Sequence, residues 1–303
     1  MPAGFLVVDK PEGVTSHDVV DFVRRHFRLR KVGHLGTLDP MATGVLPLAL
    51  GSATRLVRYL GQSVKSYIGE IRLGYSTDTY DRTGVPSTPP VVPSVSADQL
   101  DRLAAFFHGT QSQVPPPFSA KKVEGVRSYQ LARRGIQAAL RPVTVQIHSI
   151  RLRLQAADLV EFELTCSPGT YVRSIAHKLG QQLSCGAHLH QLRRVAAGRF
   201  SESEAVDLEF LRRLDQSRLG SLILPMEAAL DHLPSVTIDG ETETLIKSGR
   251  DFSWSGPPLE AGSVVRILSR LEKLIGLAEA VAGDLRQPAG CRFHPFLVLS
   301  DPK

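Results

Sequence analysis

The sequence has few cysteines and no long apolar run, and each absence excludes a class of protein. Its three cysteines, Cys166, Cys185 and Cys291, are odd in number and far apart, which argues against a disulfide framework or a metal knuckle. The apolar run at Phe5–Val8 is too short for a signal peptide. No stretch approaches the roughly 20 apolar residues of a membrane helix. We therefore expect a soluble, cytoplasmic protein with reduced thiols.

Sequence motifs that bind common cofactors are also missing. No glycine-rich loop is followed by Gly-Lys-Ser/Thr, and no G-x-G-x-x-G follows a predicted strand, so neither a P-loop nor a dinucleotide cofactor is indicated. A metal site is not favoured, because His34 and Asp39 are the only neighbouring ligands in the richest motif. A metal-dependent nuclease would need clustered carboxylates, which are absent. We expect chemistry without a cofactor.

The chain has a moderate positive charge that is unevenly distributed. It has 303 residues, enough for one large and one small domain, with 42% hydrophobic and 22% charged residues. Residues 1–231 contain 28 Lys and Arg against 21 Asp and Glu, whereas residues 232–303 contain 8 against 9. Two interpretations fit this charge: an ordinary soluble surface, or a face on the first part that binds a polyanion.

Hydrophobic periodicity predicts a chain of mixed helices and strands. Val19, Val20 and Val23 share a helical stripe that follows a cap at Thr15 or Ser16. Alternation or apolar runs predict strands, and longer periodic segments predict further helices. The predicted strands are 5–9, 67–73, 143–154, 159–166 and 189–200, and the predicted helices are 98–107, 171–183 and 205–214. After about residue 232, short segments at 235–238, 263–268, 274–278 and 296–299 predict a small β-rich domain.

Two segments without helical periodicity contain the candidate functional residues. Gln113–Tyr129 is predicted to be a long irregular loop, and its Lys121, Lys122 and Arg127 are basic. Gly33–Gly44 combines glycines with Asp39-Pro40, which favours an extended aspartate in an open loop. An aspartate in a basic region is unusual for a protein that only binds phosphate. Composition alone leaves open a turn aspartate that bonds its own backbone.

The segment Gly33–Gly44 resembles the catalytic motif of the TruB family, the bacterial tRNA pseudouridine-55 synthases. Five further segments in the same order resemble other family motifs: Asp9–Ser16, Lys65–Asp81, Gln113–Tyr129, Cys166–Ser174 and Gly186–Arg194. Leu35 stands where the family usually has threonine, and Pro168 stands where lysine is common. Six ordered matches over residues 5–200 make a specific signal, whereas residues 232–303 fit the family's C-terminal PUA domain only loosely.

This resemblance implies a fold and an activity. The expected fold class is α+β, with a mixed, largely antiparallel sheet and flanking helices in residues 1–231 and a small PUA-like β domain in residues 232–303. An RNA-binding insertion is expected around residues 110–135. The implied function is isomerisation of the uridine at position 55 in the T arm of tRNA, by base flipping and covalent catalysis. The implied partner is a tRNA T stem-loop, and the enzyme is expected to act as a monomer without guide RNA, membrane or cofactor.

The resemblance also assigns roles to single residues. Asp39 would be the nucleophile, Arg173 the cation beside it, and Tyr67 the residue that stacks on the target base. His34 would fill the space that the flipped uridine leaves. The remaining expected substrate-binding residues are pocket-lining Lys10, Tyr171 and Leu192, the orienting Asp81, and the phosphate-binding Lys121, Lys122 and Arg127, joined by Arg133 and Arg134.

Simpler interpretations of the same residues stay open at this stage. Arg173 could bind only a phosphate, Tyr67 could be a core tyrosine, His34 could be structural, and each lysine or arginine could lie on a solvated face. At the level of function, a non-catalytic RNA-binding protein or RNA chaperone would not require Asp39. A synthase that depends on guide RNA would also use the motifs, although the insertion at Gln113–Tyr129 favours action without a guide.

Overall fold

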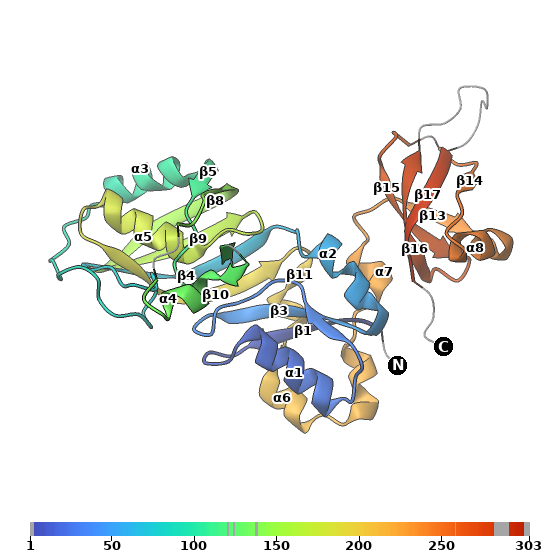
Figure 1. Cartoon of the computed structure of the whole chain (residues 1–303), viewed down its shortest axis with the longest axis horizontal. Coiled ribbons are helices and arrows are strands. Elements are labelled where there is room, and N and C mark those ends of the chain that lie inside the picture. Colours follow the sequence, from blue (N-terminus) through green and yellow to red (C-terminus); the bar gives the residue numbers. More distant parts are fainter. Residues whose placement is uncertain are drawn as a thin grey trace.

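The protein contains one long sheet with helices beside both of its halves, and a separate small sheet in its C-terminal part (Figure 1). The computed structural model describes residues 3–119, 121–123, 125–136, 139–257, 259–281 and 291–299. No helix within these ranges is both long enough and apolar enough to span a bilayer.

The elements of the first part alternate irregularly along the chain. Its strands are β1 Gly4–Lys10, β2 Val32–His34, β3 Thr43–Leu50, β4 Lys65–Leu73, β5 Gly109–Gln113, β6 Lys122–Val123, β7 Val126–Arg127, β8 Val143–Ala156, β9 Leu159–Cys166, β10 Ala187–Ala197, β11 Phe200–Ser201 and β12 Val206–Asp207. Its helices are α1 Ser16–His26, α2 Val57–Leu60, α3 Ala97–Phe107, α4 Ser128–Ala132, α5 Val172–Gln182, α6 Leu208–Arg213 and α7 Met226–Ala229, and short 3₁₀ turns lie at Gly51–Leu56, Glu202–Glu204 and Gln216–Leu222.

The long sheet has the strand order β12-β1-β3-β10-β4-β9-β8-β5, with β2 beside β3 and β11 beside β10. Its pairs are antiparallel except β1 with β12 and β3 with β10. The parallel pair in the middle aligns Gly44 with Arg194. A mixed, largely antiparallel sheet with helices is the fold class that the sequence predicts, and this prediction is confirmed.

Local sequence signals explain the elements near the middle of the sheet. Thr15 and Asp18 form a capping box at the start of α1, and Val19, Val20 and Val23 are buried beneath it. Strand β4 alternates as predicted, with Tyr67, Ile71 and Leu73 buried.

Helices α3 and α5 cover one face of the sheet, α3 against β8 and α5 against β10 (Figure 1). Apolar residues of β9 and α5, including Val160, Leu164, Ile175 and Leu179, belong to a single buried cluster that fills the space between them. Burying each such side chain contributes on the order of 1.5–3 kcal/mol. This packing fixes the start of α5 over the sheet.

The C-terminal part contains the second sheet. Its strands are β13 Ser235–Ile238, β14 Phe252–Trp254, β15 Val264–Ser269, β16 Leu274–Val281 and β17 Cys291–Val298, in the order β13-β15-β16-β17-β14, and α8 Gly240–Lys247 lies beside them. Phe293 and Ile267 are fully buried in its core, while Leu277 and Leu297 pack with Phe5 and Met226 of the first part. The division into domains at residue 231 stays a prediction.

Several predicted boundaries were wrong for identifiable reasons. Asp207 caps the sixth helix, so α6 begins only at Leu208, and Val206 pairs with Val8 instead of continuing the helix. Gln113–Tyr129 is less irregular than predicted, because Lys122–Val123 and Val126–Arg127 form a hairpin. In the C-terminal part we missed α8 and β14, and the strand predicted at 296–299 begins at Cys291.

Candidate active site

The loop between β2 and β3 holds Asp39, and hydrogen bonds from other elements fix its backbone. Ser16 donates from Oγ to the carbonyl oxygen of Leu38 (3.1 Å) and accepts from the amide of Leu38 (2.8 Å). The amide of Gly13 donates to Pro40 O at 2.8 Å, and the amide of Ala42 donates to Asp39 O at 3.0 Å. The residues on both sides of Asp39 are therefore held in place.

Lys10 supports this loop from inside the protein. Its side chain is fully buried, and Nζ donates to the carbonyl oxygens of Pro11 (2.9 Å), Val14 (2.7 Å) and Pro40 (3.3 Å). Burial lowers the pKa of Lys10 to about 8, and the negative charge of Asp39 acts in the opposite direction. Lys10 thus binds main-chain oxygens beside Asp39, and its role as a pocket-lining residue stays a prediction.

Asp39 forms a two-point ion pair with Arg173. Arg173 Nε lies 2.8 Å from Oδ2, and Nη2 donates to Oδ1 at 3.1 Å. Arg173 also donates to the carbonyl oxygens of Thr79 (3.2 Å) and Phe118 (3.1 Å). A guanidinium held at several points holds a carboxylate in a fixed orientation.

A second carboxylate shares the same guanidinium. Asp81 Oδ2 lies 3.6 Å from Arg173 Nη1, while Oδ1 accepts hydrogen bonds from Thr79 and Thr83. The side chains of Arg173 and Asp81 are 7% and 6% exposed, whereas that of Asp39 is 35% exposed. Of the three charged groups, Asp39 is the one that a substrate can reach.

Residues at the start of α5 connect this ion pair to the insertion. Gln113 donates from Nε2 to Tyr171 O at 3.0 Å and accepts from Tyr171 N at 2.7 Å, so the last residue of β5 fixes the residue before α5. Ser174 donates to Val114 O at 2.8 Å. Tyr171 itself is half-buried, and burial raises the pKa of its phenol. The position of Arg173 therefore depends on β5 and α5 together.

Apolar side chains surround the charged groups. Tyr67 and Leu192 are each 7% exposed and belong to one buried cluster with Leu38 and Met41 from the Asp39 loop. Burial raises the pKa of Tyr67, so its phenol is protonated at neutral pH. The sheet thus brings a tyrosine and a leucine from neighbouring strands beside the loop.

His34 lies at the end of β2 and is half-buried. Its Nδ1 accepts a hydrogen bond from the amide of Gly36 at 3.3 Å. Burial, with the charge of Arg194 acting in the same direction, lowers the pKa of His34. The imidazole is therefore neutral at pH 7 and presents an uncharged ring.

The basic insertion, residues 114–136, presents cations to solvent. Lys122 and Arg127 lie on the hairpin β6–β7, and Arg133 stacks over Tyr129 at 5.6 Å. The predicted phosphate-binding residues Lys121, Lys122, Arg127, Arg133 and Arg134 are all exposed. Because Arg173 bonds to Phe118 O, this basic surface begins next to the ion pair.

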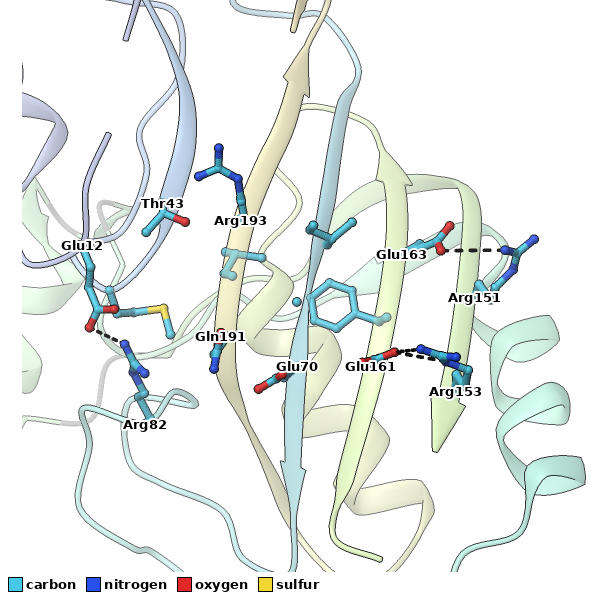
Figure 2. Close-up of a pocket in the computed structure, with 15 residues that line it drawn as sticks. Glu12, Thr43, Glu70, Arg82, Arg151, Arg153, Glu161, Glu163, Gln191 and Arg193 are labelled. Carbon is cyan, nitrogen blue, oxygen red and sulfur yellow. Dashed lines mark hydrogen bonds and ion pairs between the residues drawn. The ribbon is translucent and has the colours of Figure 1, made fainter. Parts of the chain in front are cut away.

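A hollow of about 640 Å³ adjoins the site on the exposed face of the sheet (Figure 2). It crosses β10, β4, β9 and β8, and Met41 and Leu192 border it. Its charges are largely paired with one another, Arg82 with Glu12, Arg151 with Glu163, and Arg153 with Glu161. This balanced lining offers no excess positive charge for phosphate, and Asp39 is not part of it.

Three residues that hold the site together were not predicted as site residues. Ser16 was considered only as a possible helix cap and as part of a motif, and Gln113 and Arg194 were considered only as parts of motifs. Their hydroxyl, amide and guanidinium groups bind the backbone at Leu38, Tyr171 and Gly36 respectively. Residue type and spacing gave no signal for such contacts, because their partners lie on distant elements.

The described residues contain no cluster of three or more His, Cys, Asp or Glu side chains that could hold a metal ion. The groups gathered at Asp39 are instead an accessible carboxylate, a buried guanidinium and a phenol. This arrangement suits nucleophilic chemistry by a carboxylate.

Comparisons with known proteins identify the family. Residues 24–172 match the N-terminal domain of the TruB family pseudouridylate synthases, and residues 173–231 match the tRNA pseudouridylate synthase B C-terminal domain. A tRNA pseudouridine synthase B from Solibacter usitatus (strain Ellin6076) is 46% identical over 298 residues, which cover 98% of this chain and 99% of that protein. Another from Geotalea uraniireducens (strain Rf4) is 43% identical, covering 81% of this chain and 80% of that protein.

Solved structures agree with this assignment. A chain from an H/ACA ribonucleoprotein bound to a substrate RNA containing 2′-deoxyuridine has a TM-score of 0.75 and 27% identity, covering 98% of this chain and 85% of that one. A chain from a Cbf5–Nop10–Gar1 complex has the same TM-score and coverage at 28% identity. On the family match and the identity over nearly its whole length, this chain belongs to the TruB family of pseudouridylate synthases.

Proposed function

We propose that this protein isomerises the uridine at position 55 in the T arm of tRNA to pseudouridine, with Asp39 as covalent nucleophile. The observation that carries the proposal is the ion pair in which buried Arg173 holds the accessible carboxylate of Asp39. Relatives named tRNA pseudouridine synthase B support tRNA as the substrate.

The reaction needs a nucleophile and little else. It breaks the bond between uracil N1 and ribose C1′, rotates the base, and forms a bond between C5 and C1′. The proton lost from C5 is balanced by one gained at N1, so no electron donor or acceptor is required. Asp39 begins the sequence by attacking the sugar or the base ring, and Arg173 holds the carboxylate in a fixed orientation for that attack.

The neighbouring side chains would bind the target nucleoside. Tyr67 stacks on the uracil ring, Leu192 and Tyr171 line the pocket, and Asp81 orients Arg173 through the 3.6 Å contact. Lys10 acts indirectly, because its ammonium group holds Pro40 and so the backbone beside Asp39. In this arrangement the base lies against apolar surface while the carboxylate faces the sugar or the base.

The uridine must leave its stack to reach Asp39, which costs a few kcal/mol. We propose that His34 fills the vacated position and offsets part of that cost. A half-buried, neutral imidazole suits this role, since it can stack on bases without attracting phosphate. His34→Ala should weaken RNA binding while the single-turnover rate at saturating RNA stays unchanged, and a slower rate with unchanged affinity would contradict the wedge.

The rest of the RNA would be bound by the basic insertion. Its exposed lysines and arginines are placed to contact phosphates of the T arm. The insertion supports action without guide RNA, although similar solved chains come from ribonucleoprotein complexes. We also propose that the protein acts as a monomer in the cytoplasm. Residues 1–231 would form the catalytic domain, and residues 232–303 would form a PUA-like domain, whose charge of −1 supplies little attraction for RNA.

The direct test uses purified protein and an isolated T stem-loop that contains uridine tritiated at C5. Release of tritium with many turnovers, and with no added RNA or protein, is the expected result. Binding of the stem-loop without release of tritium would contradict the proposal and would favour a non-catalytic RNA-binding protein or tRNA-folding chaperone.

A further inference from the structure

Arg194 of β10 is buried among main-chain oxygens of the Asp39 loop. It is 1% exposed and is the bulkiest of the fully buried side chains in the described residues. Nη2 donates to Gly36 O at 3.0 Å, Nη1 to Thr37 O at 3.4 Å, and Nε to Val45 O at 2.7 Å. The first two oxygens precede Asp39 and the third follows it, so one side chain ties both ends of the loop together.

This arginine is unusual because no carboxylate balances it. Within the described residues no Asp or Glu forms an ion pair with Arg194, whereas the adjacent Arg193 pairs with Asp9 at 2.8 Å and with Glu202. Burying an unpaired charge is costly unless hydrogen bonds compensate for it. Arg194 therefore binds the loop as a multiple hydrogen-bond donor and retains its charge inside the site.

A further neighbour of the guanidinium is Tyr67. The two residues lie directly opposite each other in the antiparallel pair of β4 and β10, so their side chains lie on the same face of the sheet. The positive charge of Arg194 acts to lower the pKa of the Tyr67 phenol, against the larger effect of burial. Because arginine has donors and no acceptor, a guanidinium placed here can donate to the phenol oxygen.

The backbone at Arg194 is packed closely against β3. Gly44 pairs with Arg194 between β3 and β10 and has a φ of +101°. A Cβ at Gly44 would lie 2.3 Å from Arg194 O. Gly44 thus allows β10 to approach β3 closely at the point where Arg194 reaches the loop.

We infer that Arg194 is a positioning residue for the proposed isomerisation, which fixes the Asp39 loop and the hydroxyl of Tyr67 relative to each other. The inference rests on the proposed function and adds to it the link between the two groups. It also explains why a buried arginine stands at this position without an acidic partner. Its removal should slow the chemical step more than it weakens RNA binding.

The test is a double-mutant cycle on the full-length chain with Arg194→Lys and Tyr67→Phe. In the wild-type background, Arg194→Lys should lower the single-turnover rate on the T stem-loop by about 100-fold, with the Kd for RNA within about threefold. In the Tyr67→Phe background the same change should cost less than about tenfold, because the phenol hydroxyl that Arg194 is inferred to fix is already absent. Equal decreases in the two backgrounds would overturn the inference, as would a wild-type rate in Arg194→Lys.

Arg193→Lys is the matched control, since it changes the neighbouring arginine on the sheet face with the paired charges. Its rate should stay within about threefold of wild type.

A second measurement on RNA-free protein covers the case in which Arg194→Lys does not fold. The guanidinium N–H signals of Arg194 in an NMR spectrum should exchange slowly in the wild type and faster in Tyr67→Phe. Unchanged exchange in Tyr67→Phe would overturn the link to Tyr67 even if wild-type protein isomerises uridine. A wild type that does not isomerise uridine would refute the proposed function instead.

Discussion

The Asp39 loop (residues 35–42) and the basic insertion differ in how the rest of the protein holds them. Side chains of Ser16, Lys10 and Arg194, all from other elements, bind the backbone of the loop. Most hydrogen bonds of the described part of the insertion stay within it, such as those from Ser128 to Pro117 O and Lys121 O. Bond making requires a fixed nucleophile, whereas phosphate binding tolerates an exposed, adaptable surface.

Among changes at the Asp39 loop, removal of the Arg173 guanidinium should lower the single-turnover rate most. Arg173→Met leaves Asp81 buried without its guanidinium and leaves Asp39 without an orienting partner. We expect the single-turnover rate to fall by about 1000-fold while the Kd for the T stem-loop changes by less than about threefold. Rapid-quench kinetics and filter binding measure the two quantities.

Lys178→Met on the same helix controls for the removal of a positive charge from α5, and its rate should be close to wild type. If Arg173→Met instead lowered the affinity and kept its rate, Arg173 would be a phosphate contact.

Loosening the loop without touching a charged group should have a smaller effect. Ser16→Ala removes both hydrogen bonds to Leu38 and leaves a buried amide and carbonyl unpaired, which should lower the free energy of unfolding by about 1–3 kcal/mol. The rate should fall by about tenfold, because the loop is no longer fixed at a point beside Asp39. Urea unfolding and single-turnover assays measure both, with the exposed neighbour His17→Ala as control. A destabilised variant with a wild-type rate would show that Ser16 does not position Asp39.

Changes in the basic insertion should have the opposite effect from changes in the Asp39 loop: they should weaken RNA binding and leave the rate unchanged. Replacing both Lys122 and Arg127 by alanine should weaken RNA binding severalfold and leave the rate at saturating RNA unchanged. In a plot of the logarithm of the RNA-binding constant against the logarithm of the salt concentration, the slope should become less steep by about 0.7–0.9 for each phosphate that the variant no longer neutralises. Arg213→Ala, an exposed arginine on α6, should leave the slope unchanged. A lower saturated rate in the double variant would mean that the insertion also takes part in positioning.

The smallest expected effect is a change in how the free energy of unfolding depends on pH when Lys65 is replaced. Lys65 donates to Gly61 O and Ser63 O. Burial lowers the pKa of Lys65 to about 8, below the value of about 10.4 in an unfolded chain. At pH values between these two pKa values, the unfolded chain binds more protons at Lys65 than the folded protein does. Lys65 therefore makes the free energy of unfolding rise with pH. Wild type should therefore gain stability relative to Lys65→Met from about pH 8 to 10, measured by urea unfolding. A constant difference would contradict the lowered pKa.

The sequence predicted most of the strands from local patterns, whereas the roles of the candidate site residues came from the TruB resemblance. Alternation located β4 and β9, and the capping signal at Thr15 located α1. The Asp-Pro pair and its glycines drew attention to Asp39 before any contact was known. The TruB resemblance then supplied Arg173, which lies far from Asp39 in the chain.

Features that depend on tertiary contacts could not be predicted in this way. The stripe on α1 predicted a buried face, but not that Ser16 would bond to Leu38, 22 residues away. The hairpin within Gln113–Tyr129 could not be predicted, because strands of two residues are too short to show an alternation of apolar and polar side chains. Lys10 belongs to a motif, yet only the fold shows that it is buried and binds main-chain oxygens beside Asp39.

The central claim is that the carboxylate of Asp39 performs the chemistry. The most direct measurement compares Asp39→Asn with wild type on the tritiated T stem-loop, recording tritium release and RNA affinity together. The account predicts no measurable tritium release and an affinity within severalfold of wild type, because asparagine keeps the size of the side chain but is not a nucleophile. Turnover by Asp39→Asn at a rate near that of wild type would contradict it.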